Sequence, residues 1–157
     1  MRILNLTQHK LTIEQEIAGV YTKQHQAIKL ALTFNEMPTK ALIQAKVKEL
    51  VQVAEAEKYR YAQTMGQHAF ESVEECGCSY EECREAAHQE LANVMDAPFR
   101  VMIGGAPYLM GPLESALKAY NFIPMYAYSE RVGVEVNNAD GTVSKKFEFR
   151  HLGFYEA

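Results

Sequence analysis

Two adjacent glycines, Gly104 and Gly105, stand between an apolar segment and a segment with helical spacing, which makes them a candidate anion-binding turn. Glycine allows backbone N–H groups to approach an anion closely at the N-terminus of a following helix. Ala106 belongs to the same turn, and the neighbouring Tyr108 ring could stack on a base. The sequence lacks the G-x-G-x-x-G spacing of dinucleotide sites, so a tight turn without a ligand stays open as the alternative.

A polar triplet, Thr7, Gln8 and His9, directly follows the first apolar segment of the chain. Imidazole can bind a phosphate or act as a general acid or base near neutral pH, and a threonine hydroxyl can donate a hydrogen bond to a phosphate. His9 is therefore the candidate catalytic residue, with Thr7 and Gln8 as ligand-binding neighbours. In the alternative interpretation, Thr7 and Gln8 satisfy backbone groups of the loop and His9 is simply exposed.

Ser129 and Arg131 follow the third apolar segment and complete the set of candidate binding residues. Arginine presents a planar fork of N–H donors that suits a phosphate group. A surface ion pair is the competing interpretation of Arg131.

A group of sulfur and imidazole side chains, Cys76, Cys78, Cys83 and His88, forms a C-x-C-x4-C-x4-H pattern that could hold zinc. Cys83 and His88 are five residues apart on a predicted helix, however, and so do not share one of its faces. We therefore favour free thiols near a helix start, and we predict neither a bound metal nor a cofactor. The three cysteines lie too close together in sequence to be a dispersed disulfide framework.

Apolar spacing and capping signals place these candidate residues on secondary-structure elements. Apolar runs predict strands at residues 2–6, 99–103 and 125–128. Helical spacing and N-cap residues predict helices at residues 12–19, 24–32, 39–57, 79–95 and 107–121. Two of these helices should begin with a capping box, formed by Thr12 with Gln15 and by Ser79 with Glu82. Alternating valines, with Asn-Asn and Asp-Gly turn signals between them at residues 137–141, predict a C-terminal hairpin.

Strands that alternate with helices predict parallel pairing through right-handed crossovers. The expected fold is therefore α/β, a small Rossmann-like three-layer sandwich with a mainly parallel sheet and a C-terminal β-hairpin. We expect residues 1–157 to form a single α/β domain with a helical insertion at about residues 59–97. Ligands of open α/β sheets bind beyond the carboxyl ends of the strands. Because each of the three candidate segments follows a predicted strand, we expect them to form one rim.

Composition and charge narrow the class of partner. The chain has 157 residues, of which 48% are hydrophobic and 23% charged, and these proportions are ordinary for a globular protein. A net charge of −4 and a pI near 5.7 argue against binding of duplex DNA but allow a local cationic pocket for a small anion. No apolar run approaches the ~20 residues of a membrane span, and the N-terminal residues lack the apolar core of a signal peptide. We therefore expect a cytoplasmic protein.

Residues 3–15 read Ile-Leu-Asn-Leu-Thr-Gln-His-x-Leu-Thr-x-x-Gln, and this segment resembles the start of small CRISPR-associated Rossmann-like proteins. In that family a first strand ends in a short polar segment with a histidine, and Met102–Pro107 would be the second rim loop. The family is similar to the sensors and ring nucleases that bind cyclic oligoadenylates, usually as homodimers. The resemblance does not extend to residues 59–97 or to the C-terminal hairpin.

The resemblance implies a homodimeric nucleotide-binding protein of antiviral defence that cleaves cyclic oligoadenylate without a metal ion. His9 would act as the acid or base. The phosphate would be held by Thr7, Gly104, Gly105 and Arg131. Whether the chain is an enzyme stays open. The alternatives are a non-catalytic sensor of a nucleotide or small anion, and a ligand-free accessory or interaction protein of a mobile element.

Overall fold

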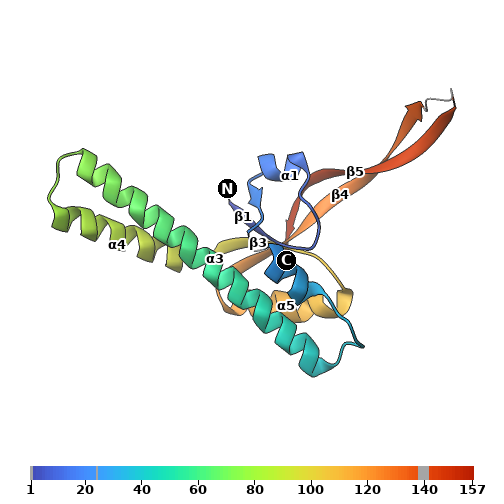
Figure 1. Cartoon of the computed structure of the whole chain (residues 1–157), viewed down its shortest axis with the longest axis horizontal. Helices are drawn as coiled ribbons and strands as arrows, with labels where there is room; N and C mark the ends of the chain where they lie inside the picture. Colours follow the sequence, from blue (N-terminus) through green and yellow to red (C-terminus); the bar gives the residue numbers. More distant parts are fainter. Residues whose placement is uncertain (1, 24, 138–141) are drawn as a thin grey trace.

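The computed structural model describes residues 2–23, 25–137 and 142–157, and it shows an α/β protein built on one five-stranded sheet (Figure 1). In chain order the elements are β1 (Ile3–Leu6), α1 (Ile13–Ile17), β2 (Val20–Tyr21), α2 (His25–Leu32), α3 (Lys40–Glu75), α4 (Tyr80–Asp96), β3 (Phe99–Ile103), α5 (Pro107–Ala119), β4 (Phe122–Asn137) and β5 (Val143–Glu156). The strand order is β2-β1-β3-β4-β5, and only the β4–β5 pair is antiparallel. The predicted α/β class, with a mainly parallel sheet and a C-terminal hairpin, is confirmed.

The strand order creates a topological switch point between β1 and β3, which is the place where the direction of the crossover connections reverses. From β1 the chain crosses over through α1 to β2 on one side, and it later places β3 on the other side of β1. Helix α1 covers one face of the sheet, whereas α2, α3 and α5 cover the opposite face (Figure 1). Crossovers on opposite faces leave a crevice at the carboxyl ends of the two strands where the direction reverses. The residues that directly follow β1 and β3 therefore border this crevice.

The main hydrophobic core lies between the sheet and helices α2, α3 and α5. Alternate residues of β1 and β3 face this core, namely Leu4, Leu6, Phe99, Val101 and Ile103. The four-residue spacing of Leu109, Leu113 and Leu117 turns one face of α5 toward them, as the sequence predicts. The helix ends just before Asn121, whose φ of 59° is the left-handed conformation that asparagine tolerates at a helix end.

The opposite face of the sheet has a much thinner cover. A smaller cluster of four buried residues lies there, and its members are Ile3, Val20, Met102 and Met125. Leu11, from the loop before α1, and Phe154 of β5 pack against it. Helix α1 has only five residues, so it shields part of this face and leaves the region beside the switch point accessible.

Helices α3 and α4 form a long helical pair that projects to one side of the sheet (Figure 1). The predicted helix end at residue 57 is wrong, because α3 continues without a break to Glu75. Its distal half packs on α4 through small residues, since a methyl group added to Gly66 would lie 2.9 Å from the Ala87 carbonyl oxygen. The predicted capping box of Ser79 and Glu82 at the start of α4 is confirmed. None of the described helices, long α3 included, is apolar enough to cross a membrane.

Strand β4 joins two strands that the sequence predicts as separate. The prediction that a strand ends at Tyr128 is wrong, because β4 runs through to Asn137 with a shift of register between Tyr128 and Ser129. Strand β3 pairs with β4 only as far as Met125. Beyond it, residues 126–137 and 143–155 form a two-stranded ribbon, here called the β-arm, that projects from the sheet (Figure 1). The predicted Asp-Gly turn at residues 140–141 and the predicted helix start at Gln24 lie outside the described residues.

Candidate functional site

A cleft of about 500 Å³ lies at the switch point, and we call it the switch-point cleft. Its walls come from the loop after β1, the start of α1, the end of β3 and the base of the β-arm. The lining residues are Thr7, His9, Lys10, Thr12, Gln15, Met102, Ile103, Gly104, Tyr126, Ala127, Ser129 and Phe149. Two of these residues, His9 and Lys10, are basic, and none is acidic. The cleft is thus locally cationic in a protein of net negative charge.

The loop after β1 is held in shape by the buried side chain of Asn5. Its carbonyl oxygen accepts a hydrogen bond from the Thr7 N–H at 2.9 Å, and its amide nitrogen donates to the His9 carbonyl oxygen at 3.2 Å. The same nitrogen donates to the Thr22 hydroxyl at 2.9 Å. The Thr7 hydroxyl oxygen in turn accepts from the His9 N–H at 3.2 Å. One amide therefore fixes the backbone that presents His9 and Lys10 at the cleft.

Gln8, the middle residue of the predicted triplet, faces away from the cleft. Its side-chain amide donates to the Lys29 carbonyl oxygen at 3.3 Å and to the Thr33 hydroxyl at 3.2 Å, so it ties the loop to the end of α2. The structure thus brings Thr7 and His9 to the cleft and gives Gln8 a structural contact instead.

The start of α1 forms a wall that contains site residues missed by the sequence analysis. Thr12 and Gln15 make a reciprocal capping box, in which the Thr12 hydroxyl accepts from the Gln15 N–H at 3.3 Å and the Gln15 side-chain oxygen accepts from the Thr12 N–H at 3.1 Å. That leaves the Gln15 side-chain N–H groups as donors for a ligand. Lys10 was missed although it directly follows His9, and its adjacency was the available signal.

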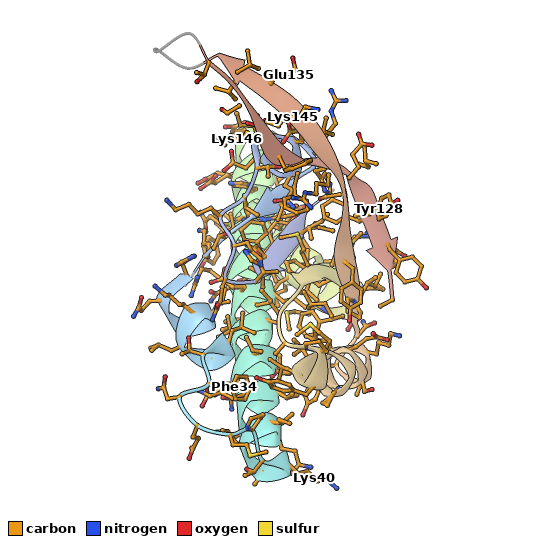
Figure 2. The ribbon with its side chains drawn as sticks, turned by 90° about the vertical axis from the view of Figure 1, so that its right-hand side faces the viewer. Phe34, Lys40, Tyr128, Glu135, Lys145 and Lys146 are labelled. Carbon is orange, nitrogen blue, oxygen red and sulfur yellow. The ribbon has the colours of Figure 1, made fainter. Side chains whose placement is uncertain are left out.

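Only the first glycine of the predicted turn borders the cleft. Gly104 lies against Thr7, because an added methyl group would sit 3.4 Å from the Thr7 Cγ2. Gly105 faces the other way, toward Met110 of α5. Tyr108 packs edge-on against Phe34, with ring centroids 5.3 Å apart, at the α2 side of the molecule where Figure 2 labels Phe34. Ala106, the N-cap residue of α5, also stands outside the lining.

The β-arm supplies the last wall. Ser129 lies within β4 rather than beyond its end, and it lines the cleft opposite the glycine turn together with Phe149 of β5. Arg131 is not brought to the cleft, because its guanidinium carbon lies 3.9 Å from the centre of the Phe147 ring. The Tyr126 hydroxyl points to α5 and donates to Glu114 at 3.4 Å, and burial, with the nearby carboxylate, raises the pKa of this phenol.

The cysteine segment lies far along the helical pair, away from the switch-point cleft. Cys76 and Cys78 are exposed at its tip, whereas Cys83 is buried between the helices. In the part of the chain that the structure describes, no three His, Cys, Asp or Glu side chains come close enough to hold a metal ion. Burial raises the pKa of the Cys83 thiol, which keeps it protonated and unreactive.

Residues 1–155 match the family described as the uncharacterized protein MJ1673 family. The chain belongs to this family. Comparisons with curated proteins and with solved structures give no match. The matched range includes the switch-point cleft, the helical pair and the whole β-arm, so membership of the MJ1673 family covers all three features. The family description states no activity, and the resemblance of residues 3–15 to CRISPR-associated proteins stays a prediction.

Proposed function

We propose that the switch-point cleft binds a nucleotide, with a phosphate at His9 and Lys10 and the base against the apolar wall. The observation that carries this proposal is the position of the cleft, which lies beyond the carboxyl ends of β1 and β3 where the crossovers diverge. Nucleotides are the common ligands of this position in open α/β sheets. The cationic loop gives the position a preference for anions.

The polar side of the cleft offers donors of several kinds to a phosphate. Lys10 supplies an ammonium group, and Thr7 and Ser129 supply hydroxyl groups. The His9 side chain is exposed, and no hydrogen bond of the described residues uses its imidazole. A phosphate with three or four oxygens can accept from several of these donors together.

The apolar side suits a nucleobase. Met102 and Ile103 at the end of β3 and Phe149 of the β-arm are apolar residues that line the cleft. An aromatic ring stacks on a base with a gain of roughly 1–3 kcal/mol in single-stranded nucleic-acid sites. This combination of apolar wall and cationic loop distinguishes a nucleotide from an inorganic anion.

Thermal-shift and calorimetric titrations with AMP, ATP, cyclic oligoadenylates and inorganic phosphate test the proposal. A nucleotide at 100 times its dissociation constant stabilises the fold by about 2.7 kcal/mol. Lys10→Glu should abolish that stabilisation. Lys40→Glu, which reverses an exposed cation at the start of α3 (Figure 2), is the matched control and should leave it unchanged. If no nucleotide stabilises the wild type, or if both variants respond alike, the cleft is not a nucleotide site.

We further propose, from the resemblance of residues 3–15, that the bound nucleotide is a cyclic oligoadenylate and that its ring is opened. In that reaction a ribose 2′-oxygen attacks the adjacent phosphorus, the 5′-oxygen leaves, and a 2′,3′-cyclic phosphate remains. His9 would remove the 2′-proton or return one to the leaving oxygen, and Thr7 and the Gly104 backbone would contact the phosphate. Gly105 and Arg131 fall outside this arrangement because neither borders the cleft.

Product analysis of wild type and His9→Ala separates cleavage from binding. Loss of cleavage at unchanged affinity in His9→Ala supports the catalytic role of the imidazole. Binding of cyclic oligoadenylate without any cleavage by the wild type makes the protein a sensor, and it removes the phosphodiesterase activity while the nucleotide site stands.

A further inference from the structure

The β-arm has an open edge along its outer strand. Among the described strands, β4 beyond Met125 pairs with β5 alone, and β5 is the last strand of the sheet. A long two-stranded ribbon is marginally stable in water, and an edge strand presents alternate backbone N–H and C=O groups to any strand that approaches. The arm projects away from the helical pair, and α1 lies beside its base, so this edge is open to approach along the part that extends beyond α1 (Figure 1).

Large apolar side chains are exposed along the same outer strand. Val143, Phe147 and Phe149 of β5 are 60%, 53% and 70% exposed. Phe147 lies over Gly133 of β4, and Arg131 covers part of its remaining face. Phe147 and Phe149 lie on one face of the arm, because they pair with Gly133 and Arg131 of β4. Contiguous exposed apolar surface of this kind is typical of an interaction site.

The charges of the β-arm are mixed rather than one-sided. Its described charged residues are Glu130, Arg131, Glu135, Lys145, Lys146, Glu148 and Arg150, and those near the tip are labelled in Figure 2. Four cations against three carboxylates give no basic strip for a nucleic acid and no acidic strip for a basic peptide. Alternating signs along one strand instead suit a partner with the same alternating signs.

We propose that β5 pairs antiparallel with β5 of a second copy of this chain, about a two-fold axis perpendicular to the sheet. Such an axis keeps every side chain on its own face, so each side chain meets one from the same face of the copy. With Phe147 on the axis, Lys146 lies opposite Glu148 of the copy. With Phe149 on the axis, Glu148 lies opposite Arg150 of the copy.

The intervening register is excluded by charge. With Glu148 on the axis, the two Glu148 carboxylates oppose each other, and Lys146 opposes Arg150. Like charges directly opposite across a strand pair are destabilising, whereas opposite charges contribute favourably. In each favourable register, the phenylalanine on the axis lies beside the same phenylalanine of the second chain. Both registers therefore cover aromatic surface that the single chain exposes. The paired arms join two five-stranded sheets into one.

Sedimentation analysis of the full chain tests this dimer. The sedimenting mass of the wild type should rise toward twice that of the 17.8-kDa chain as the protein concentration is raised to about 100 µM. Glu148→Lys places like charges opposite each other in both favourable registers and should raise the dimer Kd at least about tenfold. Met37→Ser, which removes another strongly exposed apolar side chain far from the arm, should leave the Kd unchanged. A wild type that stays monomeric over this range, or a Glu148→Lys variant that dimerises as well as the wild type, overturns the proposal.

Charge exchange identifies the register. Lys146→Glu with Glu148→Lys restores the dimer if Phe147 lies on the axis, and Glu148→Lys with Arg150→Glu restores it if Phe149 does. Circular dichroism of each variant establishes that the fold is intact. If Glu148→Lys fails to fold, Phe147→Ser serves as the second disrupting variant. Restoration by neither exchange means that the arms do not pair through β5. The dimer does not depend on the nucleotide proposal, because sedimentation is measured without ligand.

Discussion

The helical pair and the β-arm are two hairpins of the same chain that project to opposite sides of one sheet, and they bury their surfaces differently (Figure 1). In the helical pair, Cys83 is 1% exposed and Gly66 brings the two backbones into close contact. In the β-arm, Phe149 is 70% exposed. The helical pair buries its packing residues between its two helices, whereas the β-arm exposes large apolar side chains to solvent.

The difference follows from backbone hydrogen bonding. Each helix satisfies its own N–H and C=O groups, so two helices need only a strip of small residues to pack as a closed unit. A two-stranded ribbon satisfies half of its backbone groups internally and leaves the rest at its edges. The helical pair is therefore self-sufficient, whereas the β-arm is built for a further strand.

The largest effect that we predict is a difference in the rate of thiol labelling between the exposed cysteines and the buried cysteine of the helical pair. Cys76 and Cys78 at the tip should react with a thiol reagent at the rate of free thiols at pH 7.5. Cys83 should react at least about 100-fold more slowly, because burial raises its pKa and the helices must separate to expose it. Mass spectrometry of the labelled peptides measures both rates. Equal rates at all three cysteines would show that the helical pair opens freely.

Gly66→Ala should break the close contact of the two helices. The added methyl group would lie 2.9 Å from the Ala87 carbonyl oxygen, so the backbones must move apart. We expect a loss of about 2 kcal/mol in the free energy of unfolding by urea, the usual cost of overpacking. The control is Gly111→Ala in α5, where the new methyl group meets no atom, with an expected change below about 1 kcal/mol. A destabilisation no larger at residue 66 than at residue 111 would refute the close packing.

The same small residues explain what the sequence could not predict. The first half of α3 was predicted correctly because Val47 and Leu50 give it an apolar stripe. Its second half packs through Ala62 and Gly66, which add little hydrophobicity, so the predicted helix stopped too early. The capping boxes of α1 and α4 were predicted because their signals are local.

In the β-arm, the sequence failed to predict the full length of β4, because the strand pairs with another strand on only one side there. Ser129 and Arg131 interrupt the apolar pattern, but β4 has only β5 beside it there, and a ribbon in solvent needs no apolar run. Thr7, His9 and Gly104 lie at the switch-point cleft because each follows a strand whose end the sequence predicts at the observed residue. Phe149 was missed because a hairpin strand reaches the cleft only through tertiary folding, whereas Lys10 was missed although it directly follows His9.

Lys58→Met tests the point where the helical pair joins the sheet. The Lys58 ammonium lies 5.7 Å from the centre of the Phe122 ring, and the side chain is buried. Burial lowers the pKa of Lys58, with Asp96 opposing the shift, so the unfolded chain holds this proton more tightly than the folded chain does. Replacement by methionine should stabilise the fold by about 1 kcal/mol at neutral pH.

The difference in stability between Lys58→Met and the wild type should depend on pH in a defined direction. Below the folded pKa of Lys58 the cost of burying the charge is complete. As the pH rises through that value toward the usual lysine pKa, the folded chain releases the proton and the cost declines. The advantage of Lys58→Met over the wild type should therefore shrink between neutral and alkaline pH, as urea titrations at several pH values will show. A constant difference, or a destabilised variant, would mean that the ammonium makes a favourable contact.

Phe147→Ser should have the smallest effect on the free energy of unfolding of the monomer. It therefore tests the difference between the β-arm and the helical pair, where Gly66→Ala should cost more. The Phe147 ring is half exposed and contacts mainly Arg131 and Gly133, so its loss should cost the monomer about 0.5 kcal/mol. The free energy of unfolding must be measured at submicromolar protein, where the proposed dimer dissociates. At higher concentration the wild type gains stability from pairing and the variant does not, so the difference between them should grow with concentration. A difference that is large at every concentration would mean that the β-arm, like the helical pair, is stabilised within one chain, and the distinction between the two hairpins would fail.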